Sequence, residues 1–534
     1  MAQEHLDRLT SIDVSFLHQE GPASHMHIGG VAIFDGPPPS FSEVLDHIRG
    51  RLHLVPRYRQ KLATPPLDTG RPLWVDDNEF ELEYHVRETV LPAPGSEQEL
   101  FELVAQLASR QLDRSRPLWE FWVVTGLKPS SGSRHERFAL VSKNHHALVD
   151  GISGVDLAAV LLDFAPEPVP IPVDGLVPWE ARPEPSQLDL ALAGLRGSVD
   201  TWAELAVRGL GAVTRPQRSV AAARDAAEGL GELVWAALNP APETPLNVPI
   251  GPRRRFTVVR QSLSDYKVVK NRFGGTVNDV VLTVVAGALG AWLRSRGIRT
   301  EGVELRALVP VSVRTEHDQG SMGNRLTAMR GLLPVYARDP VARLGVVSRA
   351  MDQLKESKQA VGASTLAAAS DRLPPTVLAQ ASRIQFSTRL FNLLVTNIPG
   401  PQMPLYILGR RLSDLFPLAF LPENNALAVA IMSYNGHIEY GLLGDYDALP
   451  DIDLIAREID RALAELVSAA DSGVNVASIA RRRQKQQPQD RAAAKKRGPA
   501  ADMRERARNG KRPQTNGDSG KTDEPPTDPP QTDS

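Results

Sequence analysis

Two adjacent histidines are the residues of this sequence best suited to chemistry. They are His145 and His146 in the segment KNHHALVDGISG, and Asp150 and Gly151 follow closely. Histidine is scarce in the chain, with 12 among 534 residues, and its pKa suits proton transfer near neutral pH. The preceding RFALVSK is typical of a strand and the following GVDLAAVLLDF of a short helix. The pair is therefore expected in a loop between two rigid elements, where functional residues concentrate.

Four interpretations of the pair are open. Two imidazoles and a carboxylate could bind a metal, but neighbours on a strand point to opposite faces and no HExxH motif or cysteine accompanies them. A serine hydrolase would need a GxSxG elbow, which the sequence lacks. Buried, structural histidines are common. The fourth interpretation is a general base held by the local turn, in which Gly151 permits a sharp bend and Asp150 orients the loop through an arginine.

Composition restricts the compartment and the class of protein. The apolar fraction of 42% suffices for sizeable cores, and the absence of cysteine excludes disulfides, thiolate metal sites and a cysteine nucleophile. It fits a reducing compartment. The start of the chain has no signal-peptide pattern, and no run of about 18 apolar residues predicts a transmembrane helix. Attachment to a membrane surface stays open.

Charge is unevenly distributed along the chain. Residues 481–534 hold 14 Lys and Arg against 8 Asp and Glu, whereas the other 480 residues hold 47 against 55. Apolar content collapses in the same region, so residues 476–534 are predicted to be a disordered basic tail. This tail lacks interleaved aromatic residues for base stacking, which argues against nucleic acid as a partner. An anionic membrane or lipid-droplet surface is one candidate partner, and a merely solubilising role is the other.

The rest of the chain divides into two predicted α/β regions and a linker. Residues 1–165 alternate strand patterns with helices that begin at the Ser-x-x-Glu signals of Ser40 and Ser96. Residues 166–250 form the linker: a proline-rich stretch and two helices that contain Trp202 and Trp235. In residues 251–475 we expect a long helix capped by Thr276, several strands, a hairpin around Asn435-Gly436 and a closing helix.

The motifs together resemble those of a known family. HHALVDG is similar to the active-site motif of the chloramphenicol-acetyltransferase-like superfamily of CoA-dependent acyltransferases and condensation domains. Further stretches resemble motifs of the bacterial wax ester synthase/diacylglycerol acyltransferase family. They occur in the same order as in that family and span roughly residues 5–470. These are LTSIDVSFLHQE, the Pro-Leu-Trp motif at Pro117, Leu118 and Trp119, TPLNVPIGPRRRF, the Asn-Asp motif at Asn278 and Asp279, LVPVSVR, GNRLT and VTNIPGP.

The resemblance implies two chloramphenicol-acetyltransferase-like α/β domains with the active site at their interface. It implies an enzyme that transfers the acyl group of a long-chain acyl-CoA to diacylglycerol or a fatty alcohol, giving triacylglycerol or wax ester. His146 would be the general base, supported by His145 and Gly151. Asp150 would turn away and pair with an arginine, for which Arg57 and Arg59 are candidates. Acyl-CoA would be a co-substrate, with no metal and no bound cofactor.

For several other residues, the sequence allows both a functional and a structural role. Asn278 is expected in the first turn of a helix, where it could stabilise an oxyanion or serve as a helix cap. Pro117, Leu118, Trp119 and Asp279 are expected to line the substrate site. Arg253–Arg255 could attract CoA phosphates or lipid headgroups, or be a solvated run.

The expected location is cytoplasmic, peripheral to the inner membrane or lipid droplets. Acyl transfer to another hydroxyl or amine, and a catalytically silent lipid-binding protein, remain alternatives.

Overall fold

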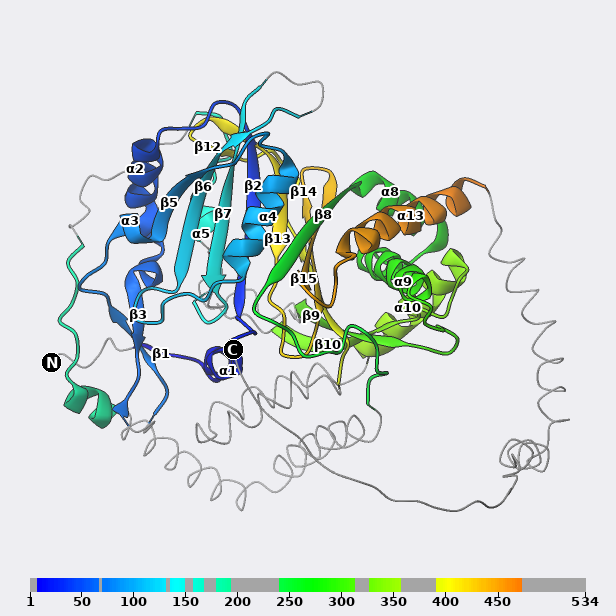
Figure 1. Cartoon of the computed structure of the whole chain (residues 1–534), viewed down its shortest axis with the longest axis horizontal. Helices are drawn as coiled ribbons and strands as arrows, with labels where there is room; N and C mark the ends of the chain where they lie inside the picture. Colours follow the sequence, from blue (N-terminus) through cyan, green and yellow to red (C-terminus); the bar gives the residue numbers. More distant parts are fainter. Residues whose placement is uncertain are drawn as a thin grey trace, which may run out of the picture. The chain divides into compact units, whose positions relative to one another are not determined.

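The computed structural model describes residues 7–66, 70–130, 135–148, 157–167, 179–193, 240–312, 326–356 and 390–472. The described residues form two six-stranded sheets and a small three-stranded sheet (Figure 1). The strand order of the first large sheet is β12 (Tyr406–Ile407), β13 (Arg410–Leu418), β2 (His27–Asp35), β7 (Arg137–His145), β6 (Trp119–Leu127) and β5 (Val86–Val90). The second has the order β10 (Leu326–Leu333), β9 (Leu305–Ser312), β11 (Leu393–Pro399), β14 (Leu427–Tyr434), β15 (His437–Asp445) and β8 (Arg254–Ser262). The small sheet has the order β1 (Asp7–Arg8), β4 (Leu73–Asp76) and β3 (Gln60–Ala63).

The three helix starts predicted from the sequence are confirmed. Helices α2 (Phe41–Arg51), α4 (Glu97–Ala108) and α9 (Val277–Ser295) each begin at a complete capping box, at Ser40, Ser96 and Thr276 respectively. At Thr276 the backbone N–H donates to the Asp279 carboxylate at 2.8 Å, and Asp279 N–H donates back to Thr276 Oγ1 at 3.2 Å. A fourth capping box, from Thr10 and Asp13, begins α1 (Ser11–Gln19).

Helices cover both faces of the first sheet. Alternate residues of a strand point to opposite faces, so two apolar layers form. On one side α4 packs its buried residues against β2 and β7, with Leu100, Val104, Val31, Ile33 and Val141 in one cluster. On the other side α2 packs against the same two strands, with its Val44 and Ile48 in one cluster with Phe34 of β2 and Phe138 of β7. The short helices α3 (Leu82–His85) and α5 (Leu157–Val160) complete this half. The central strand β7 is thus held rigidly along its length, up to the histidine at its end.

A strand from the second half of the chain completes the first sheet. β13 pairs antiparallel with β2, from Arg411 opposite Asp35 to Leu418 opposite Gly29. Between β11 and β14, both in the second sheet, the chain crosses to the first sheet, forms β12 and β13 there, and returns. The expected domain limits of 1–165, 166–250 and 251–475 remain a prediction.

The second sheet is covered by α9, α8 (Leu263–Phe273), α10 (Pro340–Glu356) and α13 (Ile452–Asp471), as Figure 1 shows. The predicted hairpin is confirmed, because β14 and β15 meet at Asn435 and Gly436, both with positive φ. By length and composition alone, helix α9 is long and apolar enough to cross a membrane. Because 78% of its apolar window is buried inside the protein, it is the core helix of this half.

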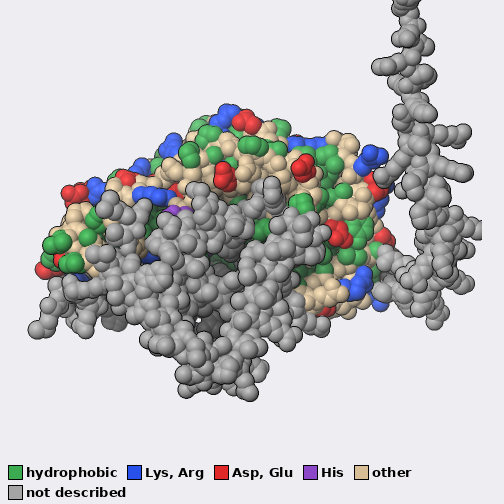
Figure 2. All heavy atoms as spheres, turned by 90° about the horizontal axis from the view of Figure 1, so that it is seen from below, with side chains coloured by type: hydrophobic (Ala, Val, Ile, Leu, Met, Phe, Trp, Pro, Cys, Tyr) green, Lys and Arg blue, Asp and Glu red, His purple; other side chains and the backbone are tan. Residues whose placement is uncertain are grey.

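Several predicted features lie outside the described residues. They are Trp202 and Trp235 with most of their helical segment, part of the proline-rich stretch, and the tail of residues 476–534. On the surface that Figure 2 colours, acidic and basic side chains are interspersed among apolar ones.

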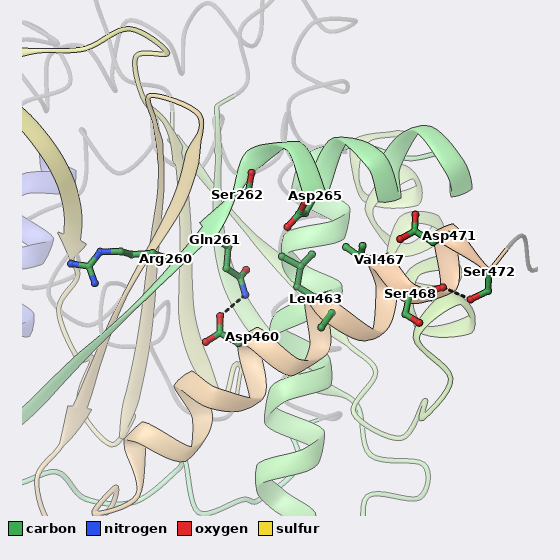
Figure 3. A pocket seen from close by; sticks show the side chains of 11 residues that line it. Arg260, Gln261, Ser262, Asp265, Asp460, Leu463, Val467, Ser468, Asp471 and Ser472 are labelled. Carbon is green, nitrogen blue, oxygen red and sulfur yellow. Dashed lines mark hydrogen bonds between the residues drawn. The ribbon is translucent and has the colours of Figure 1, made fainter. Parts of the chain in front are cut away.

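One open hollow of about 760 Å³ lies between the end of β8 and helices α8 and α13 (Figure 3). Its lining is polar, with Asp265, Asp460 and Asp471 beside Arg260 and Gln261. None of the residues that the sequence nominates for the site lines it.

Candidate active site

Backbone hydrogen bonds fix the turn that carries the histidine pair. His145 is the last residue of β7, is only 1% exposed, and donates its N–H to the Leu118 carbonyl at 2.9 Å. His146 donates its N–H to the Met26 carbonyl, just before β2, at 2.8 Å. Ala147 N–H donates to Nδ1 of the His145 ring at 3.0 Å. The turn is thereby bound to the strands on both sides of β7.

The ring of His146 lies between two aromatic side chains. It stacks on Phe16 of α1, with ring centroids 3.9 Å apart, and meets the edge of Phe420 at 5.9 Å. The ring also forms a hydrogen bond with the backbone of His146 itself. Burial of the imidazole, with a smaller contribution from the neighbouring His145, lowers the pKa of His146 to about 4. The half-buried ring is therefore neutral at neutral pH and has a nitrogen available to accept a proton.

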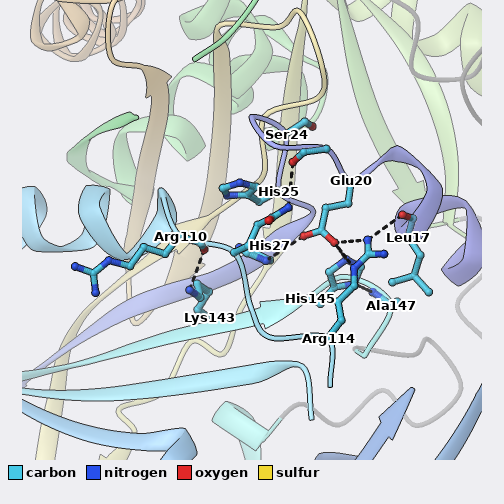
Figure 4. Close-up of polar contacts among 12 residues, drawn as sticks. Leu17, Glu20, Ser24, His25, His27, Arg110, Arg114, Lys143, His145 and Ala147 are labelled. Atoms are coloured by element: carbon cyan, nitrogen blue, oxygen red, sulfur yellow. Dashed lines mark hydrogen bonds and ion pairs between the residues drawn. The ribbon is translucent and has the colours of Figure 1, made fainter. Parts of the chain in front are cut away.

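Behind the pair lies a buried charged cluster that the sequence did not indicate (Figure 4). Glu20, which ends α1, is 3% exposed at its side chain. Its Oε1 lies 3.6 Å from Nε2 of His27, and its Oε2 lies 3.6 Å from Nε2 of His145. Arg114 Nε donates to Oε2 at 2.8 Å. His27 and His145 are directly opposite each other on β2 and β7.

The protonation of this cluster follows from burial and charge. Burial would raise the pKa of Glu20, but His145 and Arg114 together outweigh it and the pKa is lowered. Glu20 is thus a carboxylate. Burial, reinforced by the Lys143 charge, holds the pKa of His27 well below its ordinary value, so His27 is neutral.

Lys143 is a second buried charge on the same face of β7. Its ammonium donates to the carbonyls of Leu107 and Arg110, at 3.2 and 3.1 Å, and pairs with Glu120 at 3.2 Å. Burial lowers its pKa, while Glu120 acts in the opposite direction. Leu107 lies in the last turn of α4 and Arg110 lies two residues after the helix, so Lys143 joins this end of α4 to the histidine strand.

Leu118 and Trp119 of the Pro-Leu-Trp motif lie in the core beside β7. Trp119 is fully buried, donates its Nε1–H to the Tyr58 carbonyl at 2.7 Å and stacks on His85 at 4.6 Å. Pro117 accepts from the Trp119 N–H at 2.9 Å, and Leu118 accepts from His145 as described. These contacts support the histidine strand, and direct binding of substrate by the motif remains a prediction.

Asn278 lies at the start of α9, but it is not the helix cap. Thr276 and Asp279 make the capping contacts, so the buried Asp279 carboxylate has a structural role there. Asn397 of β11 donates its amide N–H to Asn278 Oδ1 at 3.0 Å. This contact leaves the Asn278 amide nitrogen without a partner among the described residues. No hydrogen bond or ring contact in the described part of the chain joins Asn278 to His145 or His146.

The remaining predicted site residues are placed as follows. Asp150 and Gly151 lie outside the described residues, so the predicted pairing of Asp150 stays untested. Of its two candidate partners, Arg57 binds Asp7 at 3.2 Å and lies over Trp74, while Arg59 lies over Trp179.

The arginine run is not a uniformly solvated surface. Arg254 is buried, donates to the carbonyls of Ala23 and Gly251, and lies 4.0 Å from the Asp445 carboxylate. Burial lowers its pKa to about 10. Arg253 remains exposed and pairs with Asp447. Among the described residues, no group of three or more His, Asp or Glu is arranged to hold a metal ion.

Sequence reasoning missed Glu20, His27 and Arg114. The stretch that contains Glu20 resembles a family motif without indicating a role for Glu20, and the three residues are separated by up to 94 positions along the chain. A buried carboxylate between two histidines becomes visible only when α1, β2 and β7 are assembled.

Fold and site together define a chloramphenicol-acetyltransferase-like acyltransferase. Trichothecene 15-O-acetyltransferase from Fusarium sporotrichioides shares this fold at 11% identity, with a TM-score of 0.54 over 86% of this chain and 95% of that one. The wax ester synthase/diacylglycerol acyltransferase of Marinobacter aquaeolei VT8 superposes with a TM-score of 0.60 over 87% of this chain and all of that one, at 28% identity. The expected α/β fold is confirmed.

The family follows from the sequence comparisons. The wax ester synthase/diacylglycerol acyltransferase catalytic domain matches residues 9–281, and the C-terminal domain of the same family matches residues 322–467. A Mycobacterium tuberculosis protein named as a probable diacylglycerol O-acyltransferase, tgs1, is 34% identical over 474 residues, covering 87% of this chain and 96% of that one. The chain belongs to the wax ester synthase/diacylglycerol acyltransferase family and is an acyl-CoA-dependent acyltransferase.

Proposed function

We propose that this enzyme transfers the acyl group of a long-chain acyl-CoA to the hydroxyl of diacylglycerol, of a fatty alcohol, or of both. The products are triacylglycerol and wax ester, with free CoA. The proposal rests on family membership together with one observation: burial lowers the pKa of His146 to about 4, so this ring in the turn after β7 is neutral at neutral pH. A neutral imidazole has one unprotonated nitrogen, which can accept a proton.

The proposed reaction is a direct transfer with no acyl-enzyme. His146 takes the proton of the acceptor hydroxyl while its oxygen attacks the thioester carbonyl. The C–S bond then breaks, and the CoA thiolate leaves and recovers the proton from His146. A chain without cysteine fits this route, because no thiol nucleophile is needed. Acyl-CoA is a co-substrate, and the proposal requires no metal or resident cofactor.

Asn278 is the proposed donor to the oxyanion. The tetrahedral intermediate places negative charge on the former carbonyl oxygen, and preorganised N–H donors stabilise it. The bond from Asn397 holds the Asn278 amide in one orientation and leaves its NH₂ group available. The positive end of α9 lies at the same place and adds to the effect.

We further propose that the enzyme works at the cytoplasmic surface of a membrane or at a lipid droplet, where its apolar acceptor resides. The 13 basic and 3 acidic residues between Arg481 and Arg512 support electrostatic attraction to anionic lipid.

A single assay tests the activity and its alternatives. The full-length protein is incubated with labelled long-chain acyl-CoA and either diacylglycerol or a fatty alcohol, and the lipids are then separated. We expect label in triacylglycerol, wax ester or both. Label found only on another hydroxyl or on an amine would replace the proposed acceptor. Binding of lipid with no transfer to any acceptor would instead indicate a catalytically silent lipid-binding protein.

A further inference from the structure

Helix α1 presents two residues to the histidine pair. Phe16 and Glu20 are four positions apart and therefore lie on the same side of the helix. Phe16 stacks on the ring of His146, and Glu20 faces the ring of His145. Glu20 also closes the helix, because its N–H donates to the Phe16 carbonyl at 3.1 Å. One short helix therefore contacts both histidines, through two different side chains.

The Glu20 carboxylate is enclosed by two imidazoles and one guanidinium. Arg114 is the direct hydrogen-bond partner, and it also donates to the Leu17 carbonyl at 3.0 Å, which ties it to α1. The two imidazole nitrogens lie 3.6 Å from the carboxylate oxygens, a distance at which the interaction is electrostatic rather than a hydrogen bond. In a buried setting such interactions are screened little.

The His145 ring connects this charge to the turn that carries His146. Ala147 N–H donates to Nδ1, so Nδ1 is an acceptor and bears no proton. The proton of the neutral ring must then be on Nε2, the nitrogen that faces Glu20. The other tautomer would set an Nδ1–H against the Ala147 N–H and a lone pair against the carboxylate, so both contacts would be repulsive.

We propose that Glu20 is a positioning residue for the acyl transfer, which selects the Nε2–H tautomer of His145 and so fixes the turn that holds His146. The inference rests on the proposed function, and it assigns Glu20 no direct contact with substrate. His27 provides a second neutral imidazole against the same carboxylate, and Arg114 compensates the carboxylate charge.

A double-mutant cycle tests the coupling. Glu20→Gln keeps the size of the side chain and removes its charge, and His145→Gln removes the ring. We expect Glu20→Gln to lower kcat about tenfold while KM for acyl-CoA changes less than about twofold, since Glu20 acts through His145 and does not bind acyl-CoA. In the His145→Gln background the same change should lower kcat less than about twofold. Glu20→Asp, which keeps the charge, should recover part of the loss.

The matched control is Glu301→Gln, which also removes a carboxylate paired with an arginine, Arg338 at 3.5 Å, but at an exposed position. It should leave kcat unchanged. Wild-type kcat in Glu20→Gln, or losses that multiply in the double variant, would overturn the proposal. If the wild type itself transfers no acyl group, the proposed function fails instead, so the two failures are distinguishable.

A spectroscopic measurement keeps the test independent of activity. The ¹⁵N shifts of labelled imidazoles report which ring nitrogen bears the proton, and His145→Gln assigns the His145 signals by difference. We expect an Nε2–H tautomer for His145 in the wild type and a loss of that preference in Glu20→Gln. An Nδ1–H tautomer in the wild type, or no change in the variant, would contradict the proposal.

Discussion

At the scale of single residues, the environment of His146 sets its chemistry. Phe16 and Phe420 surround the ring, and burial there disfavours the imidazolium form. Burial lowers the pKa of His146, which makes the imidazole a weaker base. It also keeps the ring unprotonated at neutral pH, so that the ring can accept a proton. A surface histidine would be partly protonated under the same conditions.

The pH dependence of the reaction should reflect this lowered pKa. Protonation of His146 removes the base, so kcat/KM should fall only as the pH drops toward about 4, the pKa of His146. The measurement is kcat/KM against pH over the range in which circular dichroism shows an intact fold. An acid limb centred at the ordinary histidine value of 6.5 would contradict the assignment.

Asn278→Ala tests the oxyanion role. Removal of one preorganised donor costs about 10²–10³ in kcat in well-studied enzymes. We expect a loss of that size with little change in KM, measured in the acyl-CoA assay. The melting temperature should stay close to that of the wild type, because Thr276 and Asp279 cap α9 without help from Asn278. A variant that keeps its kcat and loses mainly thermal stability would refute the role.

At the scale of elements, β13 and β15 bring the two large sheets into contact. Gly441 of β15 lies so close to β13 that an added Cβ would be 1.9 Å from the Pro417 carbonyl oxygen. Arg260 of β8 donates to Asp414 of β13 at 2.6 Å. Glu439, 1% exposed, accepts from the Leu415 N–H. A polar network therefore lies in a contact that is otherwise closely packed.

Glu439 should make the stability of the enzyme depend on pH. Burial, and secondarily the Asp414 charge, raises its pKa from 4.5 to about 8. Between these two values folded Glu439 keeps its proton while the unfolded chain has released it, so stability falls as the pH rises through this window. Glu439→Gln should remove this decline and stabilise the protein at about pH 8, by an amount on the order of a few kcal/mol. Thermal unfolding of both proteins across this pH window measures it, and parallel stability curves would contradict the assignment.

Local elements were predictable because their signals are local. A capping box spans four residues and a hairpin turn spans two, so Ser40, Ser96, Thr276 and Asn435-Gly436 could be read directly from the sequence. The placement of β13 could not be read, because strand pairing depends on contacts across hundreds of residues.

At the scale of the whole molecule, the sequence motifs point to the candidate site but not to the buried residues that surround it. The histidine pair, Asn278 and the Pro-Leu-Trp motif are compact sequence signals. Glu20 and His27 are ordinary residues until folding places them against His145. Burial also decides roles that residue type leaves open: the sequence allows Arg254 to be a phosphate binder or a surface residue, and in the structure it is a buried internal cation.

The tail and the rest of the chain carry opposite net charges. We therefore expect the tail to bind the membrane and the rest of the chain to catalyse the reaction. Each basic residue near an anionic surface contributes about 1 kcal/mol, and less as salt increases. A truncation after Ala480 should therefore turn over detergent-dispersed substrate like the full chain, but it should not float with anionic liposomes at low salt. Equal flotation of the two proteins would place membrane contact elsewhere. Loss of activity on dispersed substrate would show that the tail is required for catalysis.

The activity of His146→Ala measures the central claim most directly. The variant and the wild type are compared in the labelled acyl-CoA assay, with circular dichroism and thermal melting as controls for folding. A positioned base contributes about 10²–10⁴-fold to rate, so we expect a folded variant with kcat lowered by that factor. A folded variant that retains more than about half of the wild-type activity would show that His146 is not the general base.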